Sequence, residues 1–180
     1  MELAARLKDG ETLGDRVMKV NHAGEHGAIN IYRGQLLVCR VTAPQLISEL
    51  RDFLDHEYRH REIFGRELQR RAKRRCRSYH LCGVGGLILG IVTGLCGPSA
   101  VASTTSAVEN VVLQHLNVQL RQLRDVDSEA YQAISSIVED ERSHHDRAAL
   151  RYRQGSFWPR VISPVVATAT EAVIWLGMRL

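Results

Sequence analysis

Two segments of the chain repeat their apolar positions in steps of three and four residues, which predicts an amphipathic helix in each. The repeating positions between Pro44 and Arg75 are Leu46, Leu50, Phe53, Glu57, His60 and Phe64. Those between Ser128 and Arg153 are Ala130, Ile134, Ile137, Glu141, His144 and Ala148. Because residues at these steps share one face of a helix, each helix replaces part of its apolar face with a Glu-x-x-His pair.

Two further helices are predicted at about residues 13–40 and 100–123, and each carries one glutamate among apolar residues. These glutamates are Glu25 and Glu109, which lie 84 residues apart. The same offset of 84 residues relates Glu57 to Glu141, His60 to His144 and Gln35 to Gln119. This repetition indicates a duplicated helix pair, and two such pairs predict an all-α fold built as a four-helix bundle.

The segments outside the two repeats are apolar. Residues 78–108 contain no Asp, Glu, Lys or Arg and include LCGVGGLILGIVTGLCG, and the chain closes with PVVATATEAVIWLGMRL. We expect a single domain of repeat one (about 13–76), an apolar crossover helix (about 78–99), repeat two (about 100–153) and an apolar C-terminal helix (about 160–180). A crossover that spanned a membrane would separate the two Glu and His sets, so it is predicted to stay with the bundle, at most lying in a membrane interface.

The two Glu-x-x-His pairs and the two solitary glutamates predict a paired-metal site. One such pair is common by chance, but two in phase with apolar faces and with equally spaced glutamates are typical of ferritin-like di-iron or di-manganese bundles. Four buried carboxylates need neutralisation, and mixed carboxylate and imidazole ligands suit iron or manganese. The candidate ligands are Glu25, Glu57, His60, Glu109, Glu141 and His144. His115 lies nearly two turns after Glu109 and is a candidate neighbour of the metals, whereas the other histidines are interpreted as surface or local groups.

Charge and cysteine content narrow the classes of partner. The net charge of +4 is mildly basic, and RELQRRAKRRCR places seven basic residues against one acidic residue between Arg66 and Arg77. That run suits either contact with an anionic lipid surface or a solvated helix C-terminus, where cations are favourable. None of the four cysteines forms a Cys-x-x-Cys pair, which favours free thiols in a reducing compartment. The first residues, MELAARLKDG, contain no apolar run and predict no secretory or transit signal there.

Taken together, several stretches carry a resemblance to a known family. They are RVMKVNHAGEHGAINIYRGQ, HEYRHREIF, the Gly-rich segment before AVENVVLQH, IVEDERSHHD and the closing apolar helix. From about Asp15 to the C-terminus the chain resembles the demethoxyubiquinone hydroxylases, which are di-iron monooxygenases of ubiquinone biosynthesis. By motif match, the six candidate ligands would hold two iron ions, with Glu57 and Glu141 bridging them and Glu25 and Glu109 terminal. His115 matches a histidine near the family's metals, but Leu116 stands where better-studied members have tyrosine, which leaves a relay through a phenol in doubt.

The resemblance implies an enzyme that uses O2 to hydroxylate the ring of a polyprenylated demethoxy-benzoquinone. Its expected partners are that quinone, an external electron donor such as NADH, and a membrane surface. A homo-oligomer or a complex with other quinone-biosynthesis proteins is compatible with the resemblance. No nucleic-acid partner is expected. The expected location is the cytoplasmic face of the bacterial inner membrane. Two alternatives remain: a ferritin-like ferroxidase that handles iron, and a tRNA-modifying di-iron hydroxylase, which the scarcity of aromatic residues near the basic run disfavours.

Overall fold

The computed structural model describes residues 5–151 and 157–180, and helices joined by short connections make up this part of the chain. The elements in order are α1 (Leu13–Thr42), the 3-10 turn η1 (Pro44–Leu46), α2 (Ile47–Arg70), α3 (Tyr79–Leu95), α4 (Pro98–Leu123), α5 (Ser128–Ser135), α6 (Val138–Ala149) and α7 (Phe157–Gly177). The described residues contain no strand. The all-α prediction is therefore confirmed.

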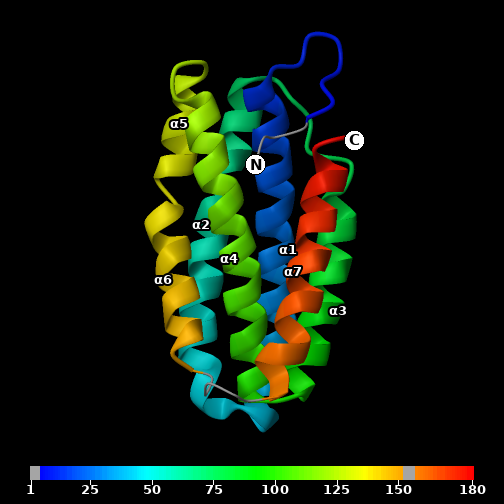
Figure 1. Ribbon diagram of the computed structural model, residues 1–180, viewed down its shortest axis with the longest axis vertical. Helices are drawn as coiled ribbons and strands as arrows, with labels where there is room; N and C mark the ends of the chain where they lie inside the picture. Colours follow the sequence, from blue (N-terminus) through cyan, green and yellow to red (C-terminus); the bar gives the residue numbers. More distant parts are fainter. Residues whose placement is uncertain (1–4, 152–156) are drawn as a thin grey trace.

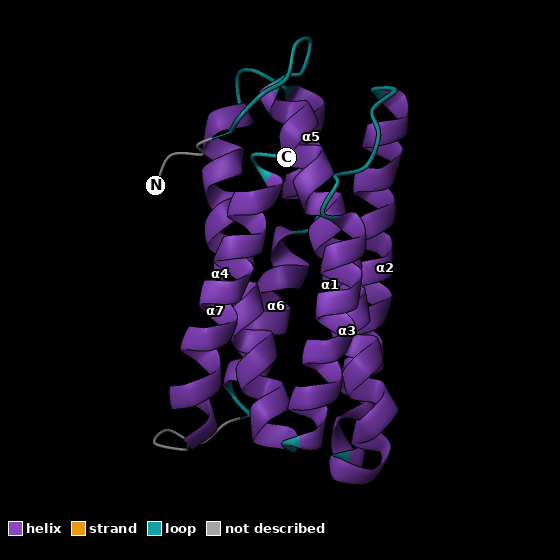
Figure 2. Cartoon of the chain, turned by 90° about the vertical axis from the view of Figure 1, so that its right-hand side faces the viewer, coloured by secondary structure: helices purple, strands orange, loops and turns teal. Residues whose placement is uncertain are grey.

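The bundle consists of α1, α2, α4 and the pair α5 and α6, which follow one another along one line. These helices run side by side along the length of the molecule (Figure 1). The two apolar helices lie outside this bundle, where α3 packs along α1 and α7 packs along α4 (Figures 1 and 2). The apolar segments outside the repeats thus become two extra helices on one side of the bundle.

The ends of the helices follow from local residue chemistry. Thr12 and Asp15 form a capping box at the start of α1, in which Thr12 Oγ1 accepts from the Asp15 backbone N–H at 3.1 Å. Pro44 begins η1, and Pro98 begins α4 directly after Gly97, whose φ of +91° favours glycine. The C-terminal apolar helix begins at Phe157, three residues earlier than expected, and residues 152 and 153 of the second predicted repeat lie outside the described residues.

The helix expected from Ser128 onward is interrupted, so the prediction of one continuous helix was wrong. At the interruption, the Ile137 N–H bonds to the carbonyl of Ile134, three residues back, and the Ser136 hydroxyl donates to the carbonyl of Ala133 at 2.8 Å. Serine side chains compete in this way with the regular helical bonds. The helix resumes when the Glu141 N–H reaches the carbonyl of Ile137, so the apolar face keeps its direction across the break.

An ion-pair network at one end joins three helices. Arg71, just after α2, donates to both carboxylate oxygens of Asp127 at 2.7 Å and lies 3.5 Å from Asp15 of α1. Asp127 also caps α5 by accepting from the Ala130 N–H. Lys73 pairs with Asp15 at 2.9 Å. These contacts hold cations of the basic run within the protein, which leaves fewer of them for a lipid surface.

The Asp127→Asn substitution tests this network. The hydrogen bond from Arg71 lowers the pKa of Asp127 below its ordinary 3.8. A carboxylate with a depressed folded-state pKa stabilises the fold above its unfolded-state pKa, and this stabilisation is lost as the pH falls through the folded-state value. Asparagine keeps a cap but not the charge, so we expect a loss of about 1–2 kcal/mol near neutral pH. Urea titrations of both proteins should show this difference shrinking below about pH 4; a difference that is constant with pH would contradict the assignment.

Candidate metal centre

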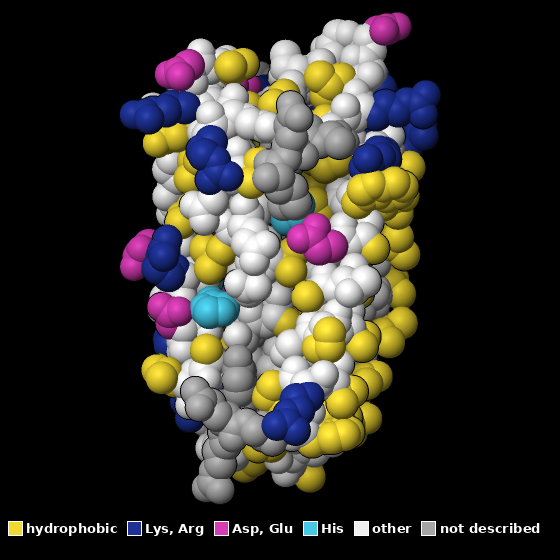
Figure 3. Space-filling model, in the orientation of Figure 1, with side chains coloured by type: hydrophobic (Ala, Val, Ile, Leu, Met, Phe, Trp, Pro, Cys, Tyr) yellow, Lys and Arg dark blue, Asp and Glu magenta, His cyan; other side chains and the backbone are white. Residues whose placement is uncertain are grey.

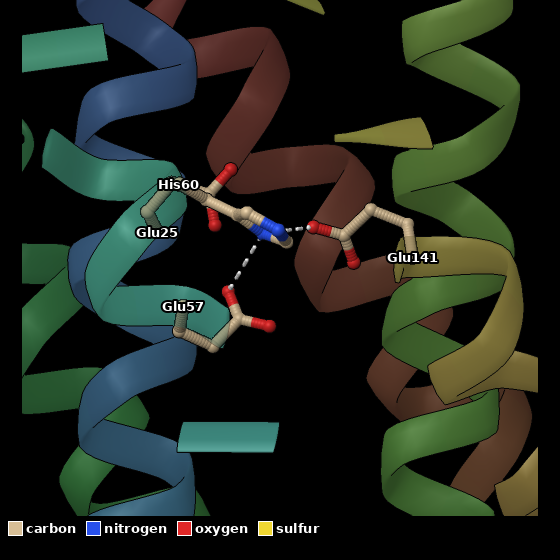
Figure 4. Close-up of side chains that lie close together, drawn as sticks. All are labelled: Glu25, Glu57, His60 and Glu141. Atoms are coloured by element: carbon tan, nitrogen blue, oxygen red, sulfur yellow. Dashed lines mark ion pairs between the residues drawn. The ribbon is translucent and has the colours of Figure 1, made fainter. Parts of the chain in front are cut away.

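All six predicted ligands converge in the middle of the bundle. Glu25 comes from α1, Glu57 and His60 come from α2, Glu109 comes from α4, and Glu141 and His144 come from α6. Each is buried, and Glu57, His60 and Glu141 are each only 1% exposed. Figure 4 shows the side chains of Glu25, Glu57, His60 and Glu141, which come from α1, α2 and α6, gathered close together. The Glu-x-x-His pairs interrupt the apolar faces because these faces surround a polar centre.

The ligand atoms form two overlapping groups. One comprises Glu25, Glu57, His60 and Glu141, and the other comprises Glu57, Glu109, Glu141 and His144. Within each group, one ligand atom from every residue lies within 4.8 Å of the others. Only Glu57 and Glu141 belong to both groups, which is the arrangement that two carboxylates bridging a pair of metals would have.

The electrostatics of the cluster favour a cation. Burial, followed by repulsion from neighbouring carboxylates, raises the pKa of Glu25, Glu57 and Glu109 well above the ordinary value. Burial also acts to raise the pKa of Glu141, but contacts with His144 and His60 outweigh it and leave this pKa lowered. Four carboxylates this close cannot all be ionised without compensation, and bound divalent cations would supply it.

The unpaired polar atoms of the cluster, like its charge, suit bound metal ions. Glu57 Oε1, His60 Nδ1, Glu141 Oε2 and His144 Nδ1 are buried without a hydrogen-bond partner. His60 Nδ1 lies 2.9 Å from Glu141 Oε1 without hydrogen-bond alignment, and His144 Nδ1 lies 3.3 Å from Glu57 Oε1. Buried polar atoms normally have partners, and these residues are suitable ligands for a metal. The buried Glu and His groups could therefore hold metal ions.

Each histidine is held from its far side by a residue of the other repeat. His60 Nε2 lies 3.1 Å from Asp140 Oδ2, and His144 Nε2 lies 3.1 Å from His56 Nδ1. These contacts direct both Nδ1 atoms toward the carboxylates, as the neighbours of metal-bound histidines commonly do. The sequence reasoning missed both partners and interpreted His56 as a surface group. The signal was available, because His56 and Asp140 are also 84 residues apart and each directly precedes a predicted bridging glutamate.

The two repeats differ beside the solitary glutamates. The buried Tyr32 hydroxyl donates to Glu109 Oε1 at 2.9 Å. The residue 84 positions later is Leu116, which has no hydroxyl to offer Glu25. The position after His115 thus has a phenol at its equivalent in the first repeat, and this phenol contacts the solitary glutamate of the second repeat.

A cavity of about 300 Å³ opens onto the cluster. Most of its wall comes from α1, α3, α4 and α7, with Glu57 of α2 and Glu141 of α6 at the cluster. The wall thus includes all four glutamates, together with apolar residues such as Leu89, Val112 and Ile174. His115 lies in this wall, and its Nε2 is 2.8 Å from Glu171 Oε2 of α7. His115 thus faces the cavity and α7, whereas the described contacts pair it with none of the six candidate ligands.

Comparison with known proteins finds sequence similarity over most of this chain. A family model described as ubiquinone biosynthesis protein COQ7 matches residues 12–177. A Dictyostelium discoideum protein named NADPH-dependent 3-demethoxyubiquinone 3-hydroxylase, mitochondrial, is 33% identical over 168 residues, which cover 92% of this chain and 76% of the relative. The Mus musculus protein of the same name is 32% identical over 170 residues, covering 92% and 77%. A Rhodospirillum rubrum 3-demethoxyubiquinol 3-hydroxylase is 31% identical over 166 residues, with the same two coverages. The matched region contains every candidate ligand.

Proposed function

From its membership of the ubiquinone biosynthesis protein COQ7 family, which makes this chain a hydroxylase of ubiquinone biosynthesis, we propose that it is a di-iron monooxygenase. Its substrate is a polyprenylated demethoxy-benzoquinone, whose ring it hydroxylates with O2. The observation that carries the proposal is the pair of overlapping ligand groups that share Glu57 and Glu141 beside a largely apolar cavity. Family membership favours this function over the ferroxidase and tRNA-modifying alternatives.

Some residues of the chain would bind the metals, and others would shape the site around them. Glu57 and Glu141 would bridge two irons, with Glu25 and His60 on one and Glu109 and His144 on the other. A bound iron pair would supply the redox chemistry of O2, in which one oxygen atom enters the ring and the other leaves as water after taking up two protons and two electrons from an external donor. The relatives' names point to a reduced nicotinamide as that donor.

Neighbouring side chains would keep these ligands in place. Asp140 and His56 orient the two imidazoles, and the Tyr32 hydroxyl fixes one oxygen of Glu109. The apolar walls of the cavity exclude water and accept the ring. These walls leave room between α3 and α7, which are not among the helix pairs in close contact, so the isoprenoid tail would leave the cavity between them.

Metal and quinone contents test the function directly. Protein reconstituted with ferrous iron under anaerobic conditions should hold about two irons per chain. Solvent extraction of protein purified from membranes should release a polyprenyl quinone, and the reduced, iron-loaded protein should consume O2 only when that quinone is added. Stoichiometric zinc, with no O2 consumption by the iron form, would contradict the proposal.

The exposed faces of α3 and α7 support a place at a membrane. Figure 3 shows apolar side chains along the edge of the molecule where Figure 1 places α3. The exposed large apolar residues of these two helices are Leu81, Val84, Leu87, Ile88, Val92, Leu95, Phe157, Val161, Val165 and Trp175. By length and composition, α7 is also apolar enough to cross a membrane, but it packs along α4 on the outside of the bundle. We therefore propose that the protein binds a membrane peripherally, and the cytoplasmic face remains the expected side.

Vesicle flotation of a triple variant checks this placement. Val84, Ile88 and Val92 are one turn apart and each more than half exposed, so replacing all three with serine should reduce vesicle binding and turnover of a long-tailed quinone together. The exposed Arg74, Arg75 and Arg77 add attraction on the order of 1 kcal/mol per cation, so anionic lipid should strengthen binding and salt should weaken it in part. Val126→Ser, at an exposed site between α4 and α5, is the control. Wild-type protein that stays soluble whatever the lipid charge would contradict the membrane placement.

A further inference from the structure

The cavity contains few polar groups besides the four glutamates. Asn21 and Gln119 are the two carboxamides in its wall, and one comes from α1 and the other from α4. If the carboxylates hold iron, as the proposed function requires, the oxygens of a quinone ring must find other partners. Ligand cavities of this kind are mostly apolar, with a small number of polar groups that fix the orientation of the ligand.

The two carboxamides bond to each other. Asn21 Nδ2 donates to Gln119 Oε1 at 2.8 Å, and Gln119 Nε2 donates to Asn21 Oδ1 at 3.0 Å. This reciprocal pair fixes the plane and orientation of both groups. Gln119 is only 1% exposed, so the protein holds it away from bulk water.

The pair retains unused hydrogen-bonding capacity. Each primary amide has two N–H donors and an oxygen with two lone pairs, and the reciprocal contact uses one donor and one lone pair of each. Among the contacts of the described residues, neither amide has another partner. A free N–H can donate to the carbonyl of a quinone, and a free lone pair can accept from the hydroxyl of a quinol, so one pair suits both redox states of the ring.

The position of the pair directs the ring toward the glutamates. Asn21 precedes Glu25 by one helical turn on α1, and Gln119 follows His115 by one turn on α4. All four of these residues line the same cavity. A ring held at the pair would therefore lie within about one helical turn of the carboxylate cluster.

In the other repeat, the equivalent glutamine lies where there is no open cavity. Gln35, which is 84 residues before Gln119, is completely buried and donates to Thr93 Oγ1 at 3.4 Å. The position equivalent to Asn21 is Thr105. Among the described residues, the space bounded by Thr105, Tyr32 and Ile31 has no room for a water molecule. Of the two equivalent pairs of positions, the one that lies beside the open cavity is therefore the one that carries an amide pair.

We propose that the Asn21–Gln119 amide pair binds an oxygen of the quinone ring and so sets the orientation of the ring against the metal centre. This inference rests on the proposed function, because that function supplies the quinone. It assigns a binding role to two residues outside the metal-ligand set.

Equilibrium dialysis of the protein reconstituted with iron and kept anaerobic in detergent micelles tests the assignment without turnover, because the carboxylates are then occupied. The first probe is a demethoxy-benzoquinone with one isoprene unit, and the second carries the same tail on a benzene ring without the two ring oxygens. Asn21→Leu and Gln119→Met should each weaken binding of the quinone about tenfold, and the double variant should bind hardly more weakly than either single one, because the amides act as a unit. Binding of the second probe should not change.

Gln35→Met is the matched control, because it makes the same substitution at the equivalent closed position, and it should bind the quinone as the wild type does. The swap variant Asn21→Gln/Gln119→Asn keeps both amides and should bind the quinone more tightly than Asn21→Leu, and this comparison keeps the test open if Gln119→Met does not fold. Equal binding of the quinone by wild type and the pair variants would overturn this inference alone. Wild-type protein that binds no quinone would overturn the proposed function and the inference with it.

Discussion

Removing either predicted bridging glutamate should abolish both the metal pair and the hydroxylation. Glu57 and Glu141 are the only residues that belong to both ligand groups, so each substitution to alanine takes one ligand from both metal positions. We expect Glu57→Ala and Glu141→Ala to lose the paired iron and to lower turnover by at least about 100-fold, since even changes beside the ligands of a metal cost 10- to 100-fold. Iron analysis after anaerobic reconstitution and a quinone hydroxylation assay measure the two effects.

Glu57→Ala should not destabilise the metal-free protein through charge. Burial and mutual repulsion raise the pKa of three of the glutamates, so the folded state accommodates these carboxylates at a cost. Removing Glu57 relieves part of that repulsion, although it also leaves a small cavity. The free energy of unfolding of the metal-free Glu57→Ala protein should therefore lie no more than about 1 kcal/mol below that of the metal-free wild type.

Glu139→Ala provides the control on the same helix as Glu141. The Glu139 side chain is 90% exposed and lies 3.8 Å from Arg142, so its removal should leave iron content and turnover unchanged. Glu25→Ala, which belongs to one group only, should reduce the affinity of one metal position more than that of the other. Wild-type turnover in either bridging variant would show that the bridges are assigned incorrectly.

The sequence was sufficient to predict the helices and the convergence of the six side chains, for a physical reason. A helix fixes which residues share a face, and a Glu-x-x-His pair on an otherwise apolar face must point into the bundle. The 84-residue offset then brings the second set to the opposite side of the same centre. The sequence alone therefore predicts that the two sets face one another: Glu25, Glu57 and His60 in the first repeat and Glu109, Glu141 and His144 in the second.

The features that the sequence did not reveal depend on contacts between segments far apart in the chain. The basic run contains Arg71 and Lys73, whose partners Asp15 and Asp127 lie more than 50 residues away, and no local pattern distinguishes them from lipid-facing cations. The break before α6 depends on a serine hydroxyl that bonds to its own helix. The cavity depends on how α3 and α7 lie against α1 and α4, and helical periodicity does not determine that placement.

Gly90→Ala should be strongly destabilising although it adds a single methyl group. A Cβ at Gly90 would meet the carbonyl oxygen of Ile31, and one at Gly86 would meet the carbonyl oxygen of Gly27, both in the backbone of α1. A backbone atom cannot rotate away as a side chain can, so α3 would have to move off α1 along its length. We expect Gly90→Ala to cost about 3 kcal/mol, at the upper end of the range for overpacking, and to lower the melting temperature by about 6–12 °C.

Gly85→Ala is the matched comparison on the same helix. A Cβ at Gly85 would have no atom within 4 Å, and alanine is the better helix former by up to about 1 kcal/mol, so this variant should be as stable as the wild type or more stable. Because α3 forms a wall of the cavity and carries much of the exposed apolar face, displacement by Gly90→Ala should also weaken binding of the quinone. Thermal unfolding that shows equal stability for the Gly90 and Gly85 variants would contradict the close approach of α3 to α1, and with it the shape of the cavity wall that the quinone proposal requires.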